Sequence, residues 1–397
     1  MPASRLPRVV WLLGLVSLCM DLSSEMIHSL LSVYLVSVIG ASTLTLGLVE
    51  GIAEGTASIS KVFSGVLSDW LGRRKPLVVL GYSLAALSKP LFPLATSAAW
   101  VLGARFVDRI GKGIRGAPRD ALLADATPPD VRGAAYGLRQ SLDTAGALLG
   151  PLVAIALMHL LHDNIRAVFW VAVLPAFLAV TVLILGVEEP ERHVDQRPRS
   201  TLPRWHDLFE LGGSFWLVAV IGAIFTLARF SEGFLALRAY DLGLSLAWTP
   251  LAMVVMNFTY VFSAYPAGQL SDRIGRTALL TVGLVTLIVA DIVLALAPNL
   301  TIVLLGVALW GLHLGLTQGL FAAMVADTAP ADLRGSAFGI FYFVSGVAAI
   351  AASLIAGGLW QWYGPKFTFL AGAAFSAAAL TGLRLSRLTP GDDARID

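Results

Sequence analysis

Long apolar runs recur along the whole of this 397-residue chain, and they constrain its fold more than any other feature. A helix of about 20 apolar residues crosses the hydrocarbon of a bilayer, and only short polar breaks separate runs of that length here. Charged residues make up 14% of the chain, against about 25% in an average soluble protein. Because open sheets and exposed loops leave backbone groups unbonded in lipid, the sequence predicts an all-α polytopic membrane protein.

Breaks at glycine, proline and charged clusters divide the chain into twelve expected spans. They cover residues 9–40, 44–69, 76–96, 99–125, 132–160, 165–187, 212–240, 247–270, 276–297, 301–328, 334–361 and 365–386. The first run begins like a secretory signal but continues to about Gly40 without a small-residue cleavage site, so we expect a retained helix. The one long polar segment lies between the sixth and seventh spans. We therefore expect a six-helix bundle in residues 1–187, a cytoplasmic linker at 188–211 and a second six-helix bundle in 212–397.

Lysine and arginine gather in the loops of one side, which indicates the cytoplasmic side of the membrane. That side would hold Arg5, Arg8, Arg73, Arg74, Lys75, Arg132, the linker arginines, Arg273, Arg276, Arg334, Arg384 and Arg387, and the other side little beyond Arg166, Arg238 and Lys366. We expect a multi-pass protein of the plasma (inner) membrane with both termini in the cytoplasm.

Several function classes are disfavoured by the same sequence. The formal net charge of +2 is too small to indicate a nucleic-acid partner. No H-E-x-x-H, G-x-S-x-G or Walker phosphate loop occurs, so we expect neither an enzyme nor a bound cofactor, and ATP-driven transport would need another subunit. The single cysteine, Cys19, excludes an intramolecular disulfide.

The two halves of the chain repeat each other. GVLSDWLGRRKPLVVLG at Gly65 matches GQLSDRIGRTALLTVG at Gly268, and ADATPPDVRGAAYG at Ala124 matches ADTAPADLRGSAFG at Ala326. Each pair is about half a chain apart. Parallel repeats related by an axis along the membrane normal are typical of transporters with a substrate site between the halves.

Over its full length the sequence resembles the major facilitator superfamily, and within it the drug/proton antiporter branch. The family's loop motif, G-x-L-x-D-x-x-G-R-R/K, stands at Gly65, Leu67, Asp69, Gly72, Arg73 and Arg74, with a weaker copy at Gly268, Leu270, Asp272, Gly275 and Arg276. The resemblance implies twelve helices in two pseudo-symmetric bundles, transport by alternating access, a monomer, and a gating role for this loop. The alternative is that the loop cations only fix the topology.

The fifth span carries a second resemblance. GALLGP, with Gly146, Gly150 and Pro151, is similar to the family's antiporter motif G-x-x-x-G-P-x-x-G-G, although Ala154 and Ile155 replace the last two glycines. The resemblance implies export by antiport. Close packing of small residues before a helix-kinking proline explains the same pattern.

The fourth span carries a third resemblance. Arg109, Lys112 and Gly113 match the exporters' R-x-x-Q-G with lysine in place of glutamine, which implies a part for Arg109 in proton coupling. Lys112 adds a cation where the family pattern has a neutral amide. The resemblance therefore leaves the usual substrate class in doubt.

The fourth span also carries a row of cations on one helical face. Arg105, Arg109, Lys112, Arg115 and Arg119 follow at steps of four, three, three and four, over about 21 Å of helix. Such a row cannot face lipid, because each charge at the bilayer centre costs at least roughly 2.5 kcal/mol. We expect it to face protein or a water-filled cavity with counter-ions. The candidates are Asp21 and Glu25 in the first span, Glu50 and Glu54 in the second, and Asp108 in the fourth.

These charges have two interpretations. Counting along the helices puts Glu54 and Arg109 each roughly 15 Å deep, where they can meet. A carboxylate that loses its cation in a desolvated site takes up a proton, so changing pairs would couple protons to substrate; the alternative is a permanent network that only fixes packing. We further expect Lys89 to reach the outer surface, and Arg229 to pair with Glu232.

The sequence thus predicts a secondary active transporter, proton-coupled and exporting a small molecule, whose partners are its substrate, protons and the bilayer. The basic fourth span favours an organic anion. A lipophilic cation or neutral drug held by Glu25 and Glu54 is one alternative. A divalent metal exporter is another, prompted by Cys19, Asp21, Glu25, Met26 and His28, although these wrap around the helix and we assign no metal site. A transporter-like ligand sensor is the third.

Overall fold

The structure, a computed structural model, describes residues 6–71, 73–128, 131–189, 211–317, 319–330 and 333–385. Within these ranges, eight side chains are not described, namely those of Gly65, Val66, Asp69, Trp70, Ser271, Asp272, Arg273 and Arg334. Every regular element in the described residues is a helix. Most of the expected linker, residues 190–210, lies outside this part of the chain.

The N-terminal half consists of six helical spans. They are α1 (Arg8–Val33) continued by η1 (Tyr34–Val38), α2 (Thr43–Leu71), α3 (Lys75–Ser88) continued by η2 (Lys89–Leu91), α4 (Ala98–Asp125), α5 (Arg132–Leu160) and α6 (Ile165–Gly186). All six agree with the expected spans to within a few residues.

The C-terminal half also has six spans, but two of them are interrupted. Its elements are α8 (Gly213–Ala228), α9 (Gly233–Asp241), η4 (Leu246–Trp248), α10 (Leu251–Ile274), α11 (Arg276–Leu296), α12 (Leu300–Thr317), α13 (Leu320–Thr328), α14 (Arg334–Tyr363) and α15 (Pro365–Leu385). The expected seventh and tenth spans are each two helices. Gly319 ends one break with φ of 73°, a left-handed conformation that glycine adopts without strain.

Nine of the described helical stretches are long and apolar enough to cross a membrane. The three spans outside this set are α2, α3 and α4. Helices α2 and α4 carry charged residues within their length, and α3 is 14 residues long. The chain is therefore an all-α polytopic membrane protein in which the most charged span, α4, belongs to the N-terminal half.

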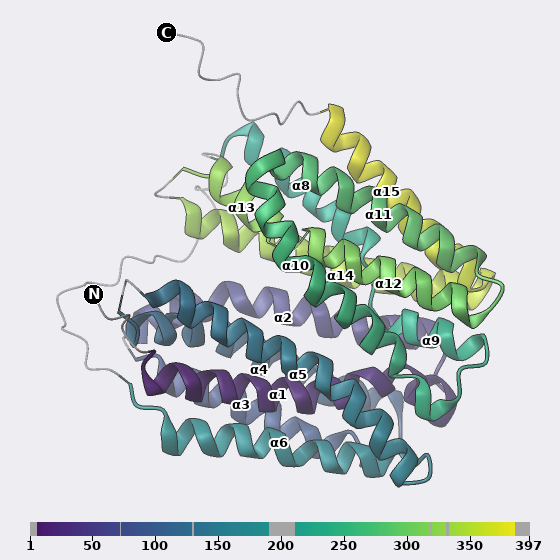
Figure 1. Cartoon of the computed structure of the whole chain (residues 1–397), viewed down its shortest axis with the longest axis horizontal. Coiled ribbons are helices and arrows are strands. Elements are labelled where there is room, and N and C mark those ends of the chain that lie inside the picture. The colour runs from purple at the N-terminus through teal and green to yellow at the C-terminus, as the bar shows by residue number, and fades with distance from the viewer. Residues whose placement is uncertain are drawn as a thin grey trace.

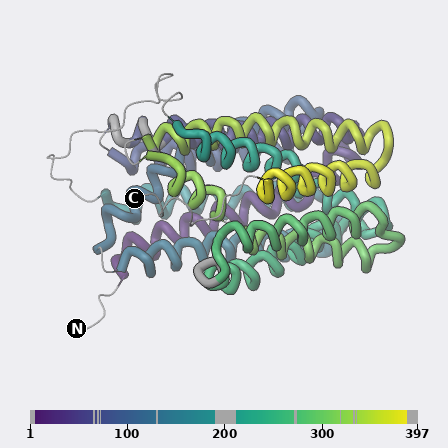
Figure 2. The backbone as a smooth tube through the Cα atoms, turned by 90° about the horizontal axis from the view of Figure 1, so that it is seen from above, coloured from purple at the N-terminus to yellow at the C-terminus, as the bar shows by residue number. Residues whose placement is uncertain are grey.

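The helices run side by side in two bundles, with the N-terminal half below and the C-terminal half above in Figure 1. Helix α1 packs against α5 and α6, α4 against α2 and α3, and α11 against α12 and α15. Figure 2 shows the same helices from above, again running side by side across the picture. We call the end at which α1 begins and α4 terminates the arginine-rich end, and the opposite end, at which α2 begins, the arginine-poor end.

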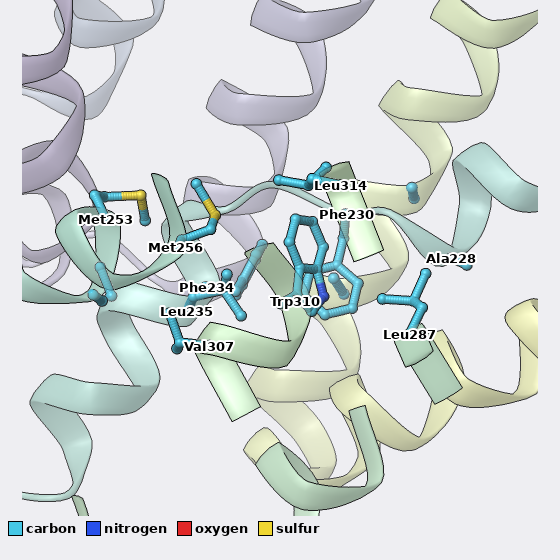
Figure 3. Packing of buried hydrophobic residues seen from close by; sticks show 14 of the residues in the cluster. Ala228, Phe230, Phe234, Leu235, Met253, Met256, Leu287, Val307, Trp310 and Leu314 are labelled. Atoms are coloured by element: carbon cyan, nitrogen blue, oxygen red, sulfur yellow. The ribbon is translucent and has the colours of Figure 1, made fainter. Parts of the chain in front are cut away.

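The C-terminal half has an aromatic core. Phe230 packs edge to face against Phe234 and Phe369, with ring centroids 5.8 and 5.6 Å apart, and lies 6.5 Å from the Trp310 ring. Figure 3 shows Phe230 and Trp310 side by side, with Leu287 of α11 beyond them. This cluster sits where α8 gives way to α9.

The two halves meet most closely where α2 crosses α14. A Cβ on Gly51 would lie 2.9 Å from the carbonyl oxygen of Ile350, and one on Gly55 2.8 Å from that of Gly346. These glycines allow the two backbones to touch. A second contact, between α5 and α10, includes a hydrogen bond of 3.1 Å from Asn257 Nδ2 to the carbonyl oxygen of Ala147.

Near the arginine-poor end, Thr43 Oγ1 of α2 lies 3.1 Å from Gln361 Oε1 of α14. In the other direction along α2, the Lys61 ammonium lies 5.8 Å from the ring centre of Tyr342. The contacts of α2 with α14 that the described residues make thus run from Thr43 to about Lys61. The halves are held together on the arginine-poor side of that point.

Candidate functional site

A cavity of about 450 Å³ lies between the two halves. The N-terminal half lines it with ionisable side chains, namely Glu25, His28, Glu54, Lys61, Arg109 and Lys112. The C-terminal half lines it mainly with aromatic side chains, namely Phe225, Phe230, Trp310, Phe321, Phe341 and Tyr342. It also contributes two charged residues, Arg229 and Glu232. One wall is therefore charged and the other largely aromatic.

The cation row of α4 faces the interior of the protein. Arg105, Arg109 and Arg115 are 3%, 5% and 5% exposed, and Lys112 is exposed only where the cavity opens beside it. Phe106, on the other face of α4, is 44% exposed. An apolar outer face and a charged inner face are what a lipid-surrounded helix requires.

Glu50 is the centre of a buried cluster at the arginine-poor side of the cavity. Its Oε2 atom lies 2.5 Å from Arg105 Nη2 and 3.5 Å from His28 Nε2. The Ser231 hydroxyl, from the C-terminal half, donates a hydrogen bond of 3.2 Å to the same oxygen. Since Ser231 lies in the break between α8 and α9, this carboxylate joins the two halves.

Arg109 lies between two carboxylates. Its Nη2 atom is 3.4 Å from Glu54 Oε1, as the depth argument predicts, and its Nε atom is 3.8 Å from Asp108 Oδ2. Asp108 also accepts a hydrogen bond of 2.8 Å from Lys89 Nζ. The expectation that Lys89 reaches the outer surface is wrong, because its ammonium pairs with Asp108 and the side chain is 1% exposed.

Two lysines of the cavity wall have no such partner. Lys61 and Lys112 make no ion pair within 4 Å with any described side chain. Both are exposed and both line the cavity. They and Arg229, which forms no ion pair within 4 Å with the described side chains either, are the cations of this site that an anion could reach without displacing a carboxylate.

Asp21 and Arg115 lie apart from this site and do not line the cavity. The Arg115 guanidinium stacks 4.4 Å from the centre of the Tyr82 ring. Asp21 belongs with a second group of charges toward the arginine-rich end, which includes Asp143, and Arg139 binds Asp143 at 2.5 Å. The acidic residues expected to balance the cation row therefore do not all lie at the cavity.

The helix-5 motif packs against the carboxylates of α1. A Cβ on Gly146 would lie 3.1 Å from Asp21 Cβ, and one on Gly150 would lie 2.5 Å from Glu25 Cβ. Pro151 follows inside α5 and is buried. The small residues thus set the position of Glu25 relative to the cavity.

The loop motif pairs with the end of the fourth span. Arg74 Nε lies 2.7 Å from Asp125 Oδ2, and in the other half Arg276 forms an ion pair with Asp327. Asp125 and Asp327 occupy corresponding positions of the repeat, whereas Arg276 corresponds to Arg73, which is exposed, and not to Arg74. Gly72 and the side chains of Gly65, Asp69 and Asp272 lie outside the described residues.

The expected pair between Arg229 and Glu232 is not formed. Helix α8 ends at Ala228 and α9 begins at Gly233, so the one-turn spacing of a continuous helix does not apply. The Arg229 guanidinium instead lies 5.4 Å from the centre of the Phe225 ring. Irregular backbone at membrane depth is tolerated where it lines a cavity, as it does here.

Several site residues are absent from the expected set. His28 enters the sequence prediction only as a metal ligand, although it lies one turn from Glu25. It bridges Glu25 and Glu50, since its Nδ1 atom lies 3.6 Å from Glu25 Oε2 and its Nε2 atom lies 3.5 Å from Glu50 Oε2. Lys61 could have been found, because it lies about two turns from Glu54 on α2. Asp125 could have been found from its repetition at Asp327.

Comparison with known proteins agrees with this architecture. The sequence model of the Major Facilitator Superfamily matches residues 13–236 and 230–396. The chain belongs to the major facilitator superfamily. It is therefore a membrane transporter and not an enzyme.

Relatives of this superfamily member extend over nearly its whole length. An uncharacterised MFS-type transporter of Methanocaldococcus jannaschii is 34% identical, covering 96% of this chain and 94% of the relative. The gentisate transporter of Corynebacterium glutamicum is 26% identical, covering 87% and 80%. The structure of the nucleoside transporter NupG superposes with a TM-score of 0.80 at 12% identity, covering 96% of this chain and 100% of that one, which shows the shared fold.

Proposed function

We propose that this chain is a proton-coupled antiporter that exports a small organic anion. The observation that carries the proposal is the pair of lysines, Lys61 and Lys112, that line the cavity with no carboxylate within 4 Å among the described side chains. A carboxylate or phosphate that enters the cavity gains two charge-assisted contacts there. Glu54 and Asp108 already hold Arg109, which keeps the resting site from binding any passing anion tightly.

The opposite wall suggests what the rest of the substrate resembles. Phe225, Phe321, Phe341 and Tyr342 line the cavity from the C-terminal half. Ring faces bind flat apolar bodies by stacking and area burial. We infer that a small aromatic carboxylate fits the site best, and the similarity to a gentisate transporter supports this class.

Alternating access follows from how the halves meet. The described contacts of α2 with α14 lie on the arginine-poor side of the cavity, so the observed conformation is closed toward that end. Since lysine and arginine mark the cytoplasmic side, we infer an inward-facing state. The hydrogen bond from Ser231 to Glu50 would have to break for the cavity to open outward.

Proteoliposomes test the proposal directly. Vesicles with an acidic interior should take up radiolabelled gentisate or benzoate against its gradient, and a protonophore should abolish the uptake. Passive permeation of a weak acid fills the alkaline compartment instead, so accumulation on the acidic side requires the antiporter. Uptake that ignores a collapsed proton gradient would remove the coupling. Uptake only into alkaline vesicles, in excess of uptake by protein-free vesicles, would indicate symport.

The second candidate is export of a lipophilic cation, and Glu232 favours it. This carboxylate lines the cavity and has no ion-pair partner within 4 Å among the described side chains. Replacing Lys112 with glutamine should abolish uptake of an aromatic carboxylate and spare tetraphenylphosphonium, whereas Glu232→Gln should do the reverse if a cation is the substrate. Lys366→Gln, at an exposed lysine in the first turn of α15, serves as the control for both.

The metal and sensor alternatives have weaker support. Among the described residues, no group of three or more His, Cys, Asp and Glu side chains is placed to hold a metal ion. Cys19 lies in the apolar core of the N-terminal half, away from Glu25 and His28. A sensor would bind ligand without exchanging it, so counterflow of labelled gentisate separates a sensor from a transporter.

A further inference from the structure

Asp291 of α11 is a buried carboxyl that the transport site does not use. It is 0% exposed, and neither Oδ atom accepts a hydrogen bond of normal geometry from the described residues. It forms no ion pair within 4 Å with any of them. An ionised carboxylate buried here would lose its hydration without gaining an ion pair or a hydrogen bond, so the carboxyl group is protonated instead.

The surroundings of Asp291 are apolar and close. A Cβ on Gly372 of α15 would lie 2.5 Å from Asp291 Oδ2 and 3.0 Å from Phe230 Cε1, so the carboxyl and the Phe230 ring both pack against this glycine. Trp310 of α12 is the polar neighbour of the carboxyl. Since Phe230 and Trp310 line the cavity, Asp291 lies behind the aromatic wall that these two rings form.

Among the described side chains, no charged group of the neighbouring helices lies within ion-pair distance of Asp291. The ionisable side chains of the elements packed against it are Tyr260, Tyr265, Asp272 and Arg273 of α10, His313 of α12, Asp327 of α13, and Lys366 and Arg384 of α15, besides Arg276 on α11 and Arg229 and Glu232 in the break. Those of α11, α13 and α15 lie at helix ends. His313 packs on Trp310 with ring centroids 5.0 Å apart, and its Nδ1 atom lies 2.6 Å from the Trp310 carbonyl oxygen.

The His313 Nε2, Trp310 Nε1 and Ser376 Oγ atoms are likewise buried without a hydrogen-bond partner among the described residues. A native interior leaves few polar atoms unsatisfied, and several within one half need an explanation. A proton-transfer site that is closed in one conformation and wet in another supplies it.

We propose that Asp291 is a proton-binding site in the C-terminal half, and that it carries the proton exchanged for the substrate anion. This rests on the antiport proposed above. In the observed conformation Asp291 holds its proton behind Phe230 and Trp310. When the break between α8 and α9 moves with the opening of the outer gate, water reaches the carboxyl and the proton leaves or returns.

The anion site itself is poorly suited to the exchanged proton. Protonating Glu54 would free Arg109 and strengthen the hold on an anion, so proton and anion would bind together and move in the same direction. Antiport needs a proton site outside the field of those cations. Asp291, in the last two turns of α11 and on the far side of an aromatic wall, meets that requirement.

Infrared spectroscopy of the purified full-length protein tests the proton directly and needs no substrate. At neutral pH the wild type should show the carbonyl stretch of a protonated carboxyl, and Asp291→Asn should remove that component. Asp327→Asn, at an exposed and ion-paired position, should leave it in place. A wild-type spectrum unchanged by Asp291→Asn in this region would overturn the proposal.

Thermal stability gives a second readout. The unfolded chain releases an aspartate proton near pH 4 while the folded chain retains it, so the wild type loses stability as pH rises and Asp291→Asn does not. The variant should therefore melt higher than the wild type at pH 8, with the gap closing toward about pH 4. An Asp291→Asn protein that melts lower at pH 8, or fails to fold, would show an ionised and partnered carboxylate instead.

Transport separates this inference from the function on which it rests. Asp291→Asn should retain counterflow of labelled gentisate and lose accumulation in acid-loaded vesicles. If the wild type moves no anion at all, the proposed function fails, and the infrared result still decides whether Asp291 holds a proton. If Asp291→Asn accumulates gentisate like the wild type, the proton travels elsewhere.

Discussion

The two halves repeat the same six-span architecture, and in each a loop arginine pairs with the corresponding aspartate, Asp125 or Asp327, but they bury different side chains. In the N-terminal half, Lys89 and Arg105 are almost fully buried and each is matched by a carboxylate, Asp108 and Glu50. In the C-terminal half, Asp291 and His313 are fully buried with no opposite charge among the described residues. The same six-span fold therefore presents a charged wall to the cavity in the N-terminal half and a largely aromatic wall in the C-terminal half.

The helices differ in the same way. The described spans of the N-terminal half are continuous apart from changes of helix type near their ends, whereas two in the C-terminal half are interrupted beside the cavity. A charged wall needs rigid helices to keep each ion pair in register. An aromatic wall has no such requirement, and its breaks supply movable backbone at the site.

The largest expected effect comes from breaking a buried pair in the charged half. Lys89→Met leaves Asp108 with Arg109 at 3.8 Å as its remaining cation, and we expect a loss of stability of about 3–5 kcal/mol. The measurement is thermal or denaturant unfolding of the purified protein.

The matched control is Lys366→Met, which removes an exposed lysine and should change stability by less than about 0.5 kcal/mol. A Lys89→Met protein as stable as this control would show that the pair is not formed. The stability changes of Lys89→Met and Asp291→Asn together compare the effect of removing a buried ionisable side chain in each half.

Much of this arrangement is predictable from the sequence. The cost of a charge in lipid fixes which way Arg105, Arg109 and Arg115 face, and helical rise alone brings Glu54 to Arg109. The first argument considers the faces of a single helix, and the second compares the depths of two residues in the membrane. They succeed because the bilayer imposes the same requirement on every helix.

The rest depends on contacts between helices that no spacing reveals. Asp21 and Glu25 are one turn apart on α1, yet only Glu25 lines the cavity. Asp291 carries no charged neighbour within a turn and has the pattern of an isolated polar residue in an apolar run. The break that separates Arg229 from Glu232 is followed by Gly233, but one glycine does not distinguish a break from a continuous helix in a chain with 38 glycines.

A smaller effect is expected where the motif glycine of α5 meets α1. Gly150→Ala places a methyl 2.5 Å from Glu25 Cβ and 3.0 Å from the Leu22 carbonyl oxygen, so the helices must separate. Overpacking of this kind costs about 1–3 kcal/mol, and transport should fall with it because Glu25 moves.

Gly103→Ala on α4 is the control, since a Cβ there meets no atom within 4 Å. It should be neutral or stabilise by up to about 1 kcal/mol through helix propensity. If Gly150→Ala behaves like Gly103→Ala in melting and transport, the glycine does not set the distance between α1 and α5.

The smallest effects are expected at the two exposed or half-buried ion pairs between a loop arginine and a helix-end aspartate, Arg74 with Asp125 and Arg276 with Asp327. Arg74 and Asp125 are 14% and 29% exposed, whereas Arg276 and Asp327 are 43% and 61% exposed. Double-mutant cycles on melting should give about 1 kcal/mol for the first pair and less than about 0.5 kcal/mol for the second. A larger coupling energy between Arg276 and Asp327 than between Arg74 and Asp125 would contradict the expectation that the ion pair of the N-terminal half is the stronger one.

Labelling of Lys112→Cys tests most directly the central claim that the charged face of α4 lines a cavity shared by the two halves. A membrane-impermeant thiol reagent applied from the arginine-rich side should modify Lys112→Cys rapidly, and should modify Phe106→Cys, on the lipid-facing side, slowly or not at all. The wild type gives the background, because its one cysteine, Cys19, is buried. An unreactive Lys112→Cys beside a reactive Phe106→Cys would contradict the account.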